Sequence, residues 1–132
     1  MRGLVAICLL VAHPALAETA TAQGAVLRML DKLSGHTEDI TLANGAMLER
    51  GPLTIRLDEC RYPANDPSSD AFAHLTVADS RAQKLAFDGW MIASSPALSA
   101  MDHPRYDVWV LNCDVPGLAP ATPPKTDTGE DE

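Results

Sequence analysis

Four of the chain's six aromatic residues lie in one stretch, residues 87–113, with the sequence Phe-Asp-Gly-Trp-Met-Ile-Ala-Ser-Ser-Pro-Ala-Leu-Ser-Ala-Met-Asp-His-Pro-Arg-Tyr-Asp-Val-Trp-Val-Leu-Asn-Cys. Aromatic side chains bury large apolar surfaces, so their clustering marks the structural centre of an aromatic-poor chain. Residues 85–92 are apolar on both faces except at Asp88, and residues 106–113 have Val108 and Val110 on one face and Trp109, Leu111 and Cys113 on the other. This pattern is typical of strands in the middle of a sheet. We therefore expect two central strands joined by residues 93–105.

The connection over residues 93–105 is too long for a tight hairpin, and its composition suits an ordered loop. Ser95 followed by Pro96 predicts one short helical turn near Ser95–Met101, with Ser95 as the N-cap. We expect Leu98 and Met101 to pack onto the sheet, which leaves the polar side chains near the end of the loop at its rim. If this loop faces a partner, the residues involved are Ser94, Ser95, Asp102, His103 and Arg105.

The rest of the folded part is typical of short strands separated by turns. Residues 25–33 fit a strand or a helix by their apolar spacing, and we favour the strand because a turn and another strand follow closely. Residues 37–42, 53–57 and 71–77 place apolar side chains on one face, which indicates half-buried strands. The sequence thus predicts an all-β domain, a small antiparallel β-sandwich or barrel of about six to seven strands.

The first 17 residues have the composition of a secretory signal. Arg2 supplies the positive start, a short apolar run follows, and Ala15-Leu16-Ala17 forms a small-x-small cleavage site. We expect cleavage after Ala17 and no membrane-spanning segment in the mature chain, because no later run approaches the ~20 apolar residues that span a bilayer.

Cleavage at this site changes the cysteine count, because Cys8 leaves with the signal and only Cys60 and Cys113 remain. An even pair in an exported chain usually forms a disulfide, so we expect these two residues to be bridged. Strict alternation would turn Cys60 toward the polar face of its strand. A β-bulge near Asp58-Glu59 would instead turn it inward.

Composition divides the mature chain into three parts: a polar leader over residues 18–24, one β domain over residues 25–115, and a disordered, Pro-rich acidic tail over residues 116–132. The full chain has a formal charge of −8, which becomes −9 when Arg2 is removed and no acid is lost. An acidic chain is repelled by phosphate backbones and anionic lipids, so we expect no nucleic-acid partner.

A serine hydrolase centred on Ser94, Ser95 and His103 is an alternative reading of the polar loop. The chain has no Gly-x-Ser-x-Gly motif, and the adjacent residues Asp102 and His103 do not readily adopt the base-and-orienter geometry of a triad. We therefore expect no catalytic residues. No metal-binding or cofactor-binding spacing is present either, so we predict neither a metal site nor a cofactor.

The aromatic residues have two readings, as core filling or as a binding surface. We expect Trp109 in the core, because a domain of this size has few other large side chains to bury. Trp90 and Tyr106 are the candidates for an aromatic surface, since Trp and Tyr dominate interface hot spots.

Several motifs between residues 25 and 113 match one protein family: Leu30-Asp31-Lys32, Cys60, Gly89-Trp90-Met91-Ile92-Ala93-Ser94-Ser95-Pro96-Ala97-Leu98, His103-Pro104, Tyr106-Asp107-Val108-Trp109 and Cys113. On these residues the chain resembles a family of short secreted proteins of Gram-negative bacteria, catalogued as domain of unknown function 2155 (DUF2155). The resemblance implies a periplasmic protein and agrees with the paired cysteines. It also implies genomic surroundings that include an accessory subunit of respiratory complex I.

These observations predict a non-enzymatic periplasmic β-domain that binds or supports an unknown envelope protein or ligand. Two alternatives remain open. One is a peripheral accessory of an inner-membrane respiratory complex, and the other is the hydrolase centred on Ser94, Ser95 and His103.

Overall fold

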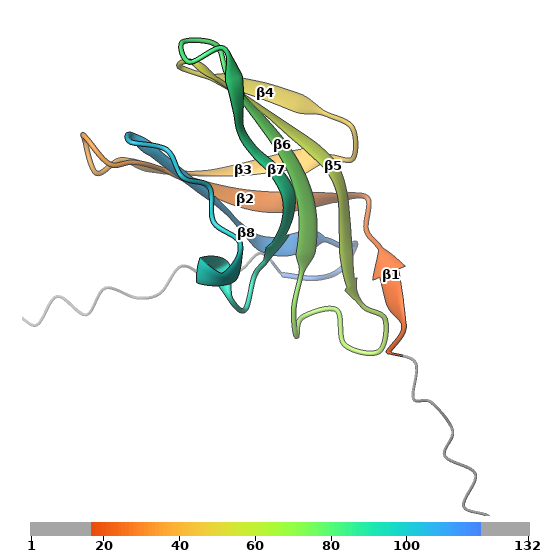
Figure 1. Ribbon diagram of the computed structural model, residues 1–132. Coiled ribbons are helices and arrows are strands. Elements are labelled where there is room, and N and C mark those ends of the chain that lie inside the picture. Colours follow the sequence, from red (N-terminus) through yellow and green to blue (C-terminus); the bar gives the residue numbers. More distant parts are fainter. Residues whose placement is uncertain (1–16, 120–132) are drawn as a thin grey trace, which may run out of the picture.

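The structure is a computed structural model that describes residues 17–119 (Figure 1). Residues 1–16 of the expected signal and residues 120–132 of the expected tail lie outside the described residues. Between residues 17 and 119 no helix is long and apolar enough to cross a membrane. The elements in chain order are β1 (Thr19–Thr21), β2 (Gly24–Asp31), β3 (Thr37–Ala43), β4 (Met47–Arg50), β5 (Leu53–Pro63), β6 (Phe72–Asp79), β7 (Lys84–Ile92), the 3₁₀ turn η1 (Pro96–Leu98) and β8 (Tyr106–Asp114).

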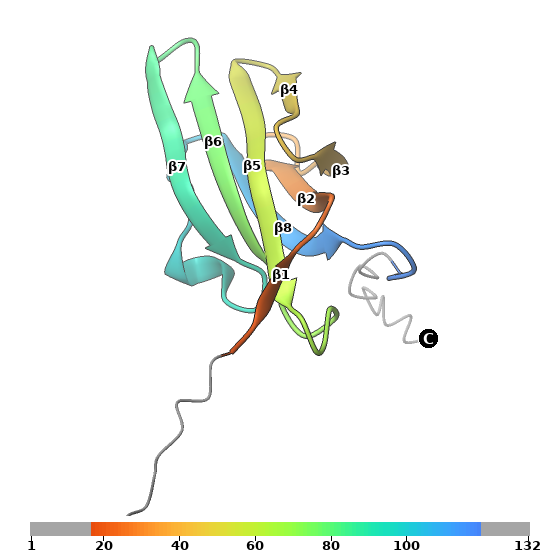
Figure 2. The ribbon, with the colours of Figure 1, turned by 90° about the vertical axis from the view of Figure 1, so that its right-hand side faces the viewer.

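The strands form two antiparallel sheets packed face to face. In the five-stranded sheet, β5 pairs with β6 on one side, and β6 pairs with β7. The other side of β5 pairs with β4 along its first residues and with β1 along its last. The three-stranded sheet has the order β3-β2-β8. The strands of the two sheets run across each other (Figure 1), and in Figure 2 β8 crosses behind β5 while β2 and β3 appear beside β5, on the side away from β6. The predicted all-β sandwich is confirmed, and the sheets do not close into a barrel.

The core lies between the two sheets and follows the alternation in the sequence. On β6, and on β5 from Leu53 to Leu57, every second side chain is buried, because successive side chains of a strand point to opposite faces. The opposing layer comes from β2 and β8. The fully buried large side chains in this core are Leu27, Leu53, Ile55, Leu57, Leu75, Val77, Met91 and Val110, together with both cysteines.

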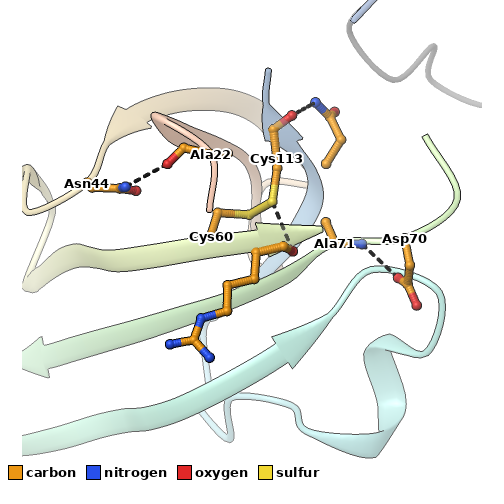
Figure 3. The surroundings of a disulfide bond; sticks show 8 residues. Ala22, Asn44, Cys60, Asp70, Ala71 and Cys113 are labelled. Carbon is orange, nitrogen blue, oxygen red and sulfur yellow. Dashed lines mark hydrogen bonds between the residues drawn. A yellow bond between two sulfur atoms is a disulfide. The ribbon is translucent and has the colours of Figure 1, made fainter. Parts of the chain in front are cut away.

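A disulfide joins the two sheets. The pairing of β5 with β6 slips by one residue between Leu57 and Glu59, which is the expected bulge, and the slip turns Cys60 into the core. Cys60 is bonded to Cys113 of β8 (Figure 3), and their Cα atoms are 5.7 Å apart. The predicted pairing is therefore present in the structure.

The prediction of two central strands is wrong. Within the described residues β7 pairs only with β6 and β8 only with β2, so both lie at sheet edges. On β7 only Met91 is buried, because the apolar side chains on its outer face have no second layer above them. The central strands are β2, β5 and β6, whose positions depend on pairing partners that a single strand's pattern does not reveal.

The inward face of β8 also differs from the prediction. Tyr106, Val108 and Val110 point inward, and Trp109 is therefore half-buried rather than part of the core. A register shift against β2 between Val26 and Leu27 then turns Cys113 onto the inward face as well. The sequence pattern gave no sign of this second bulge.

The N-terminal part of the fold begins before residue 25. The expected polar leader contains β1, which pairs with the end of β5 and places Ala22 in the core. Asn44 helps to hold the segment between β1 and β2 in place, since its Nδ2 donates to the Ala22 carbonyl at 2.7 Å (Figure 3). The leader is thus part of the folded domain.

Gly24 is required by close backbone packing. It starts β2 opposite Ala43, and a Cβ atom there would run into the backbone carbonyl oxygen of Leu42. We expect Gly24→Ala to lower the free energy of unfolding by about 1–3 kcal/mol, measured by chemical denaturation. Gly89→Ala is the matched control, because a Cβ there meets nothing closer than 3.6 Å. Equal losses in the two variants would contradict this explanation.

Candidate functional site

The loop over residues 93–105 is held at its start by two hydrogen bonds to one carboxylate. The Ser94 amide donates to Oδ1 of Asp70 at 3.0 Å, and the Ser94 hydroxyl donates to Oδ2 at 2.7 Å. Asp70 lies just before β6, 24 residues earlier in the chain. Because both bonds come from the same residue, they fix where the chain leaves β7.

The end of the loop is held by His103, which is buried rather than at the rim as predicted. Its Nδ1 accepts hydrogen bonds from the amides of Arg105 and Tyr106, both at 3.1 Å. The proton of the neutral ring must therefore be on Nε2, which lies 3.0 Å from Oδ2 of Asp79 and donates to it. His103 is buried because it makes this hydrogen bond to Asp79, at the end of β6.

Asp79 is itself buried at the end of β6. Burial on its own would raise the pKa of Asp79, but hydrogen bonds from the Ala82 amide, the His103 ring and the Arg81 amide hold it below its ordinary value. The carboxylate is thus kept ionised and able to accept the His103 proton donor. This arrangement joins the loop to the five-stranded sheet.

A third attachment joins the loop to β2. The Arg105 guanidinium donates to both carboxylate oxygens of Asp31, at 3.2 and 2.8 Å. Lys32 donates from Nζ to the His103 carbonyl at 2.6 Å and lies 3.3 Å from Asp107. The hydrogen bonds from Arg105 are the main reason that the pKa of Asp31 falls to about 2.

This pair gives the fold a predictable pH dependence. The pKa of Asp31 is about 2 in the folded protein against an ordinary value of 3.8, so its ion pair stabilises the fold above about pH 4 and is lost as the pH falls toward 2. We expect Asp31→Asn to reduce the fall of the thermal midpoint between pH 4 and 2. Asp102→Asn, which changes an exposed carboxylate of the same loop, should keep the wild-type slope. Identical slopes in all three proteins would contradict the assignment.

The anchored loop presents an apolar surface to solvent. Met101 is buried as predicted, but Leu98 is 77% exposed and does not pack onto the sheet, because η1 carries it away from the core. Beside η1, Pro96, Ala97 and Trp109 help to line a shallow cavity of about 250 Å³ whose floor includes Met101. The apolar residues of η1 therefore face outward, as does the side chain of Asp102, and Ser94, His103 and Arg105 hold the loop in place.

The geometry also bears on the hydrolase alternative. Both ring nitrogens of His103 are engaged, Nδ1 by two amides and Nε2 by Asp79. Neither is left to take a proton from Ser94, whose hydroxyl already donates to Asp70.

The helical turn that we predicted near Ser95–Met101 is shorter in the structure, where it covers only Pro96–Leu98. The side chain of Ser95 makes no cap hydrogen bond.

The two residues of the predicted aromatic surface lie in different environments. Trp90 is 37% exposed on the outer face of the five-stranded sheet, whereas Tyr106 is buried beside His103, with ring centroids 5.5 Å apart. The prediction of an exposed Tyr106 is wrong, because β8 turns this side chain into the core. Near Trp90 the structure brings together Asp58 and His74, which the sequence did not pair, with His74 Nδ1 2.8 Å from Asp58 Oδ2.

Within the described part of the chain, no group of three or more His, Cys, Asp or Glu side chains is arranged to hold a metal ion. The described loop is held by three carboxylates from other parts of the chain. Its anchors, Asp31, Asp70 and Asp79, were missed because each lies 24 or more residues from its partner and no local motif marks it.

One family model matches most of the folded part of the chain. The family model described as "Uncharacterized protein conserved in bacteria (DUF2155)" matches residues 25–113. The uncharacterized protein RP359 of Rickettsia prowazekii (strain Madrid E) is 29% identical over 87 residues, which cover 64% of this chain and 56% of that relative. The chain thus spans little more than half the length of this relative. No solved structure matches the chain.

Proposed function

The chain belongs to the bacterial family DUF2155, and we propose that it is an exported, non-enzymatic binding module of the bacterial envelope that docks onto a partner protein through the loop 93–105. The observation that carries this proposal is Leu98. This side chain is 77% exposed on a loop that three separate carboxylates hold in one shape.

A loop that is ordered before binding loses little conformational entropy when it docks, so more of the contact free energy appears as affinity. An exposed leucine alone means little, because apolar atoms make up much of any protein surface. Leu33 is 74% exposed as well, but it lies at a polar hairpin turn. Leu98 instead directly follows Pro96 and Ala97, which line a mostly apolar cavity together with Trp109, and this cavity gives a partner side chain a place to pack.

Export is supported by the disulfide between Cys60 and Cys113, because such bonds persist in oxidising compartments. For a bacterial protein of this family that contains a disulfide, we propose that the oxidising compartment is the periplasm. Cleavage of the signal after Ala17 remains a prediction, and N-terminal sequencing of the exported protein tests it.

We expect Leu98→Asp to remove partner binding while leaving the fold intact. An exposed anchor makes no contact in the core, so its loss should change the free energy of unfolding by no more than about 0.5 kcal/mol. Truncation of an interface hot spot costs about 2 kcal/mol or more of binding, which lowers affinity roughly 30-fold. Affinity capture from periplasmic extract and from detergent-solubilised membranes, with wild type and variant compared by mass spectrometry, measures this loss.

Leu33→Asp is the matched control, because the two leucines are almost equally exposed. Partners that depend on Leu98 and not on Leu33 support the proposal. Recovery of such a partner only from solubilised membranes would make the protein a peripheral accessory of an inner-membrane complex. Capture that is unaffected by Leu98→Asp, or hydrolysis that is lost in Ser95→Ala, would overturn the proposed function.

A further inference from the structure

The outer edge of β7 has backbone groups that no described strand pairs with. The Ala93 amide donates to the Ala71 carbonyl at 2.9 Å, so residue 93 faces β6. In an antiparallel pair the residues that bond to the neighbour alternate. Met91 and Gly89 therefore also face β6, and the amides and carbonyls of Trp90 and Asp88 point away from the sheet.

The same two residues place their side chains on the outer face of the sheet. Asp88 is 56% exposed, and its nearest cationic or titratable partner is Nε2 of His74 at 3.8 Å. The neighbouring carboxylates are already neutralised, since Arg56 lies 2.6 Å from Asp58 and Arg61 lies 2.7 Å from Glu59. Among these three carboxylates, Asp88 is thus the one with no arginine or lysine partner within 4 Å.

Trp90 provides an apolar wall directly beside this charge. Its ring packs edge-on against His74, with centroids 5.2 Å apart, and the Arg61 guanidinium lies 5.1 Å from its centre. An apolar groove of about 320 Å³ continues past Trp90, lined by Phe72 and Ile92. Along β7, Asp88, Trp90 and Ile92 are spaced two residues apart, which is the spacing of side chains on one face of a strand.

Native proteins usually protect an exposed edge by short length, proline, lysine or a bulge. β7 is nine residues long, and Phe87–Ile92 contains neither proline nor lysine. The one register shift with β6 lies near the other end of the strand, opposite Val77 and Ala78. The half of β7 that carries Asp88 and Trp90 therefore has a regular edge with which no described strand pairs.

We propose that this edge binds an extended peptide strand of a partner protein, with a lysine or arginine opposite Asp88 and an apolar residue opposite Trp90. Main-chain hydrogen bonds to Asp88 and Trp90 provide affinity, and the alternating side chains provide specificity. Directly opposed residues of neighbouring strands share one face, so the basic residue meets the Asp88 carboxylate and the apolar residue meets the indole. This edge is distinct from the Leu98 surface.

The test uses the full exported chain and a capped nine-residue peptide, Ser-Thr-Val-Thr-Lys-Thr-Val-Thr-Ser, whose lysine and two valines share one face in either strand direction. We expect the exchange of the Asp88 and Trp90 amides with solvent, followed by NMR, to slow at least tenfold when the peptide binds. The Gly89 and Met91 amides should be protected before and after. Binding that leaves the exchange of Asp88 and Trp90 unchanged overturns the proposal.

Charge reversal makes the test specific. Asp88→Lys should prefer the peptide with glutamate in place of lysine by at least tenfold, whereas wild type should prefer the lysine peptide. Glu49→Lys is the matched control, because Glu49 is an exposed acid on β4, at the opposite edge of the same sheet. Glu49→Lys should bind the two peptides as wild type does. Leu98→Asp should also bind them as wild type does, and this result would show that peptide binding at β7 does not depend on the Leu98 surface of the proposed function.

Two further outcomes would overturn the proposal. One is equal preference of wild type and Asp88→Lys for the two peptides. The other is protection of the Asp88 and Trp90 amides in the peptide-free protein as its concentration rises, which would identify a second copy of this chain as the occupant of the edge.

Discussion

The double variant Cys60→Ala, Cys113→Ala is expected to lose about 2–4 kcal/mol of unfolding free energy while keeping its β-sandwich fold. The bond closes a loop with a sequence separation of 53 and ties β5 of one sheet to β8 of the other. Without it the unfolded chain gains conformational freedom, and the folded domain loses the covalent bond between its two sheets. Urea unfolding followed by circular dichroism measures the loss.

Reduction of the wild-type protein is the control for this variant. Under reducing conditions wild type should fall toward the stability of the double variant, and the variant itself should not respond to the reductant. If the reductant is shown to break the bond and wild type is nevertheless equally stable with and without it, the stabilising role assigned to the disulfide is contradicted.

His103→Ala is expected to have the second large effect. The variant leaves the amides of Arg105 and Tyr106 without their acceptor and the buried Asp79 without its side-chain donor. A buried polar group without a partner costs about 1–3 kcal/mol, so the thermal midpoint should fall by roughly 5–15 °C. Partner capture should weaken as well, because the loop that carries Leu98 loses one of its three attachments.

His36→Ala is the matched control, since His36 is exposed on the turn between β2 and β3. It should leave both the thermal midpoint and partner capture unchanged. If His103→Ala and His36→Ala behave alike, His103 does not hold the loop, and the explanation for the preorganised surface fails.

Local patterns were sufficient for most strands of this fold. Leu53, Ile55 and Leu57 alternate with polar residues, and the structure buries all three. The bulge before Cys60 was also predictable, because strict alternation would have turned a cysteine of the expected disulfide away from the core. The position of β7 at an edge was not predictable, since its apolar outer face resembles that of a strand buried on both sides.

The candidate site could be predicted only in part from the sequence, because its contacts also join residues that are far apart in the chain. The composition of residues 93–105 indicated an ordered loop, but the partners that order it lie far away in the chain. His103 was placed at the rim because Asp79, 24 residues earlier, gives no local sign of its role. Leu98 was placed on the sheet because apolar residues are usually buried, and only the fold shows that η1 turns it outward.

The central claim is that Leu98 lies in an interface, and photo-crosslinking at this position tests it most directly. A benzoylphenylalanine introduced at residue 98 and irradiated in living cells should form an adduct with a distinct partner protein. The same group at residue 33, whose leucine is 74% exposed against 77% for Leu98, should not form that adduct. No adduct at residue 98, or the same adducts at both positions, would contradict the claim.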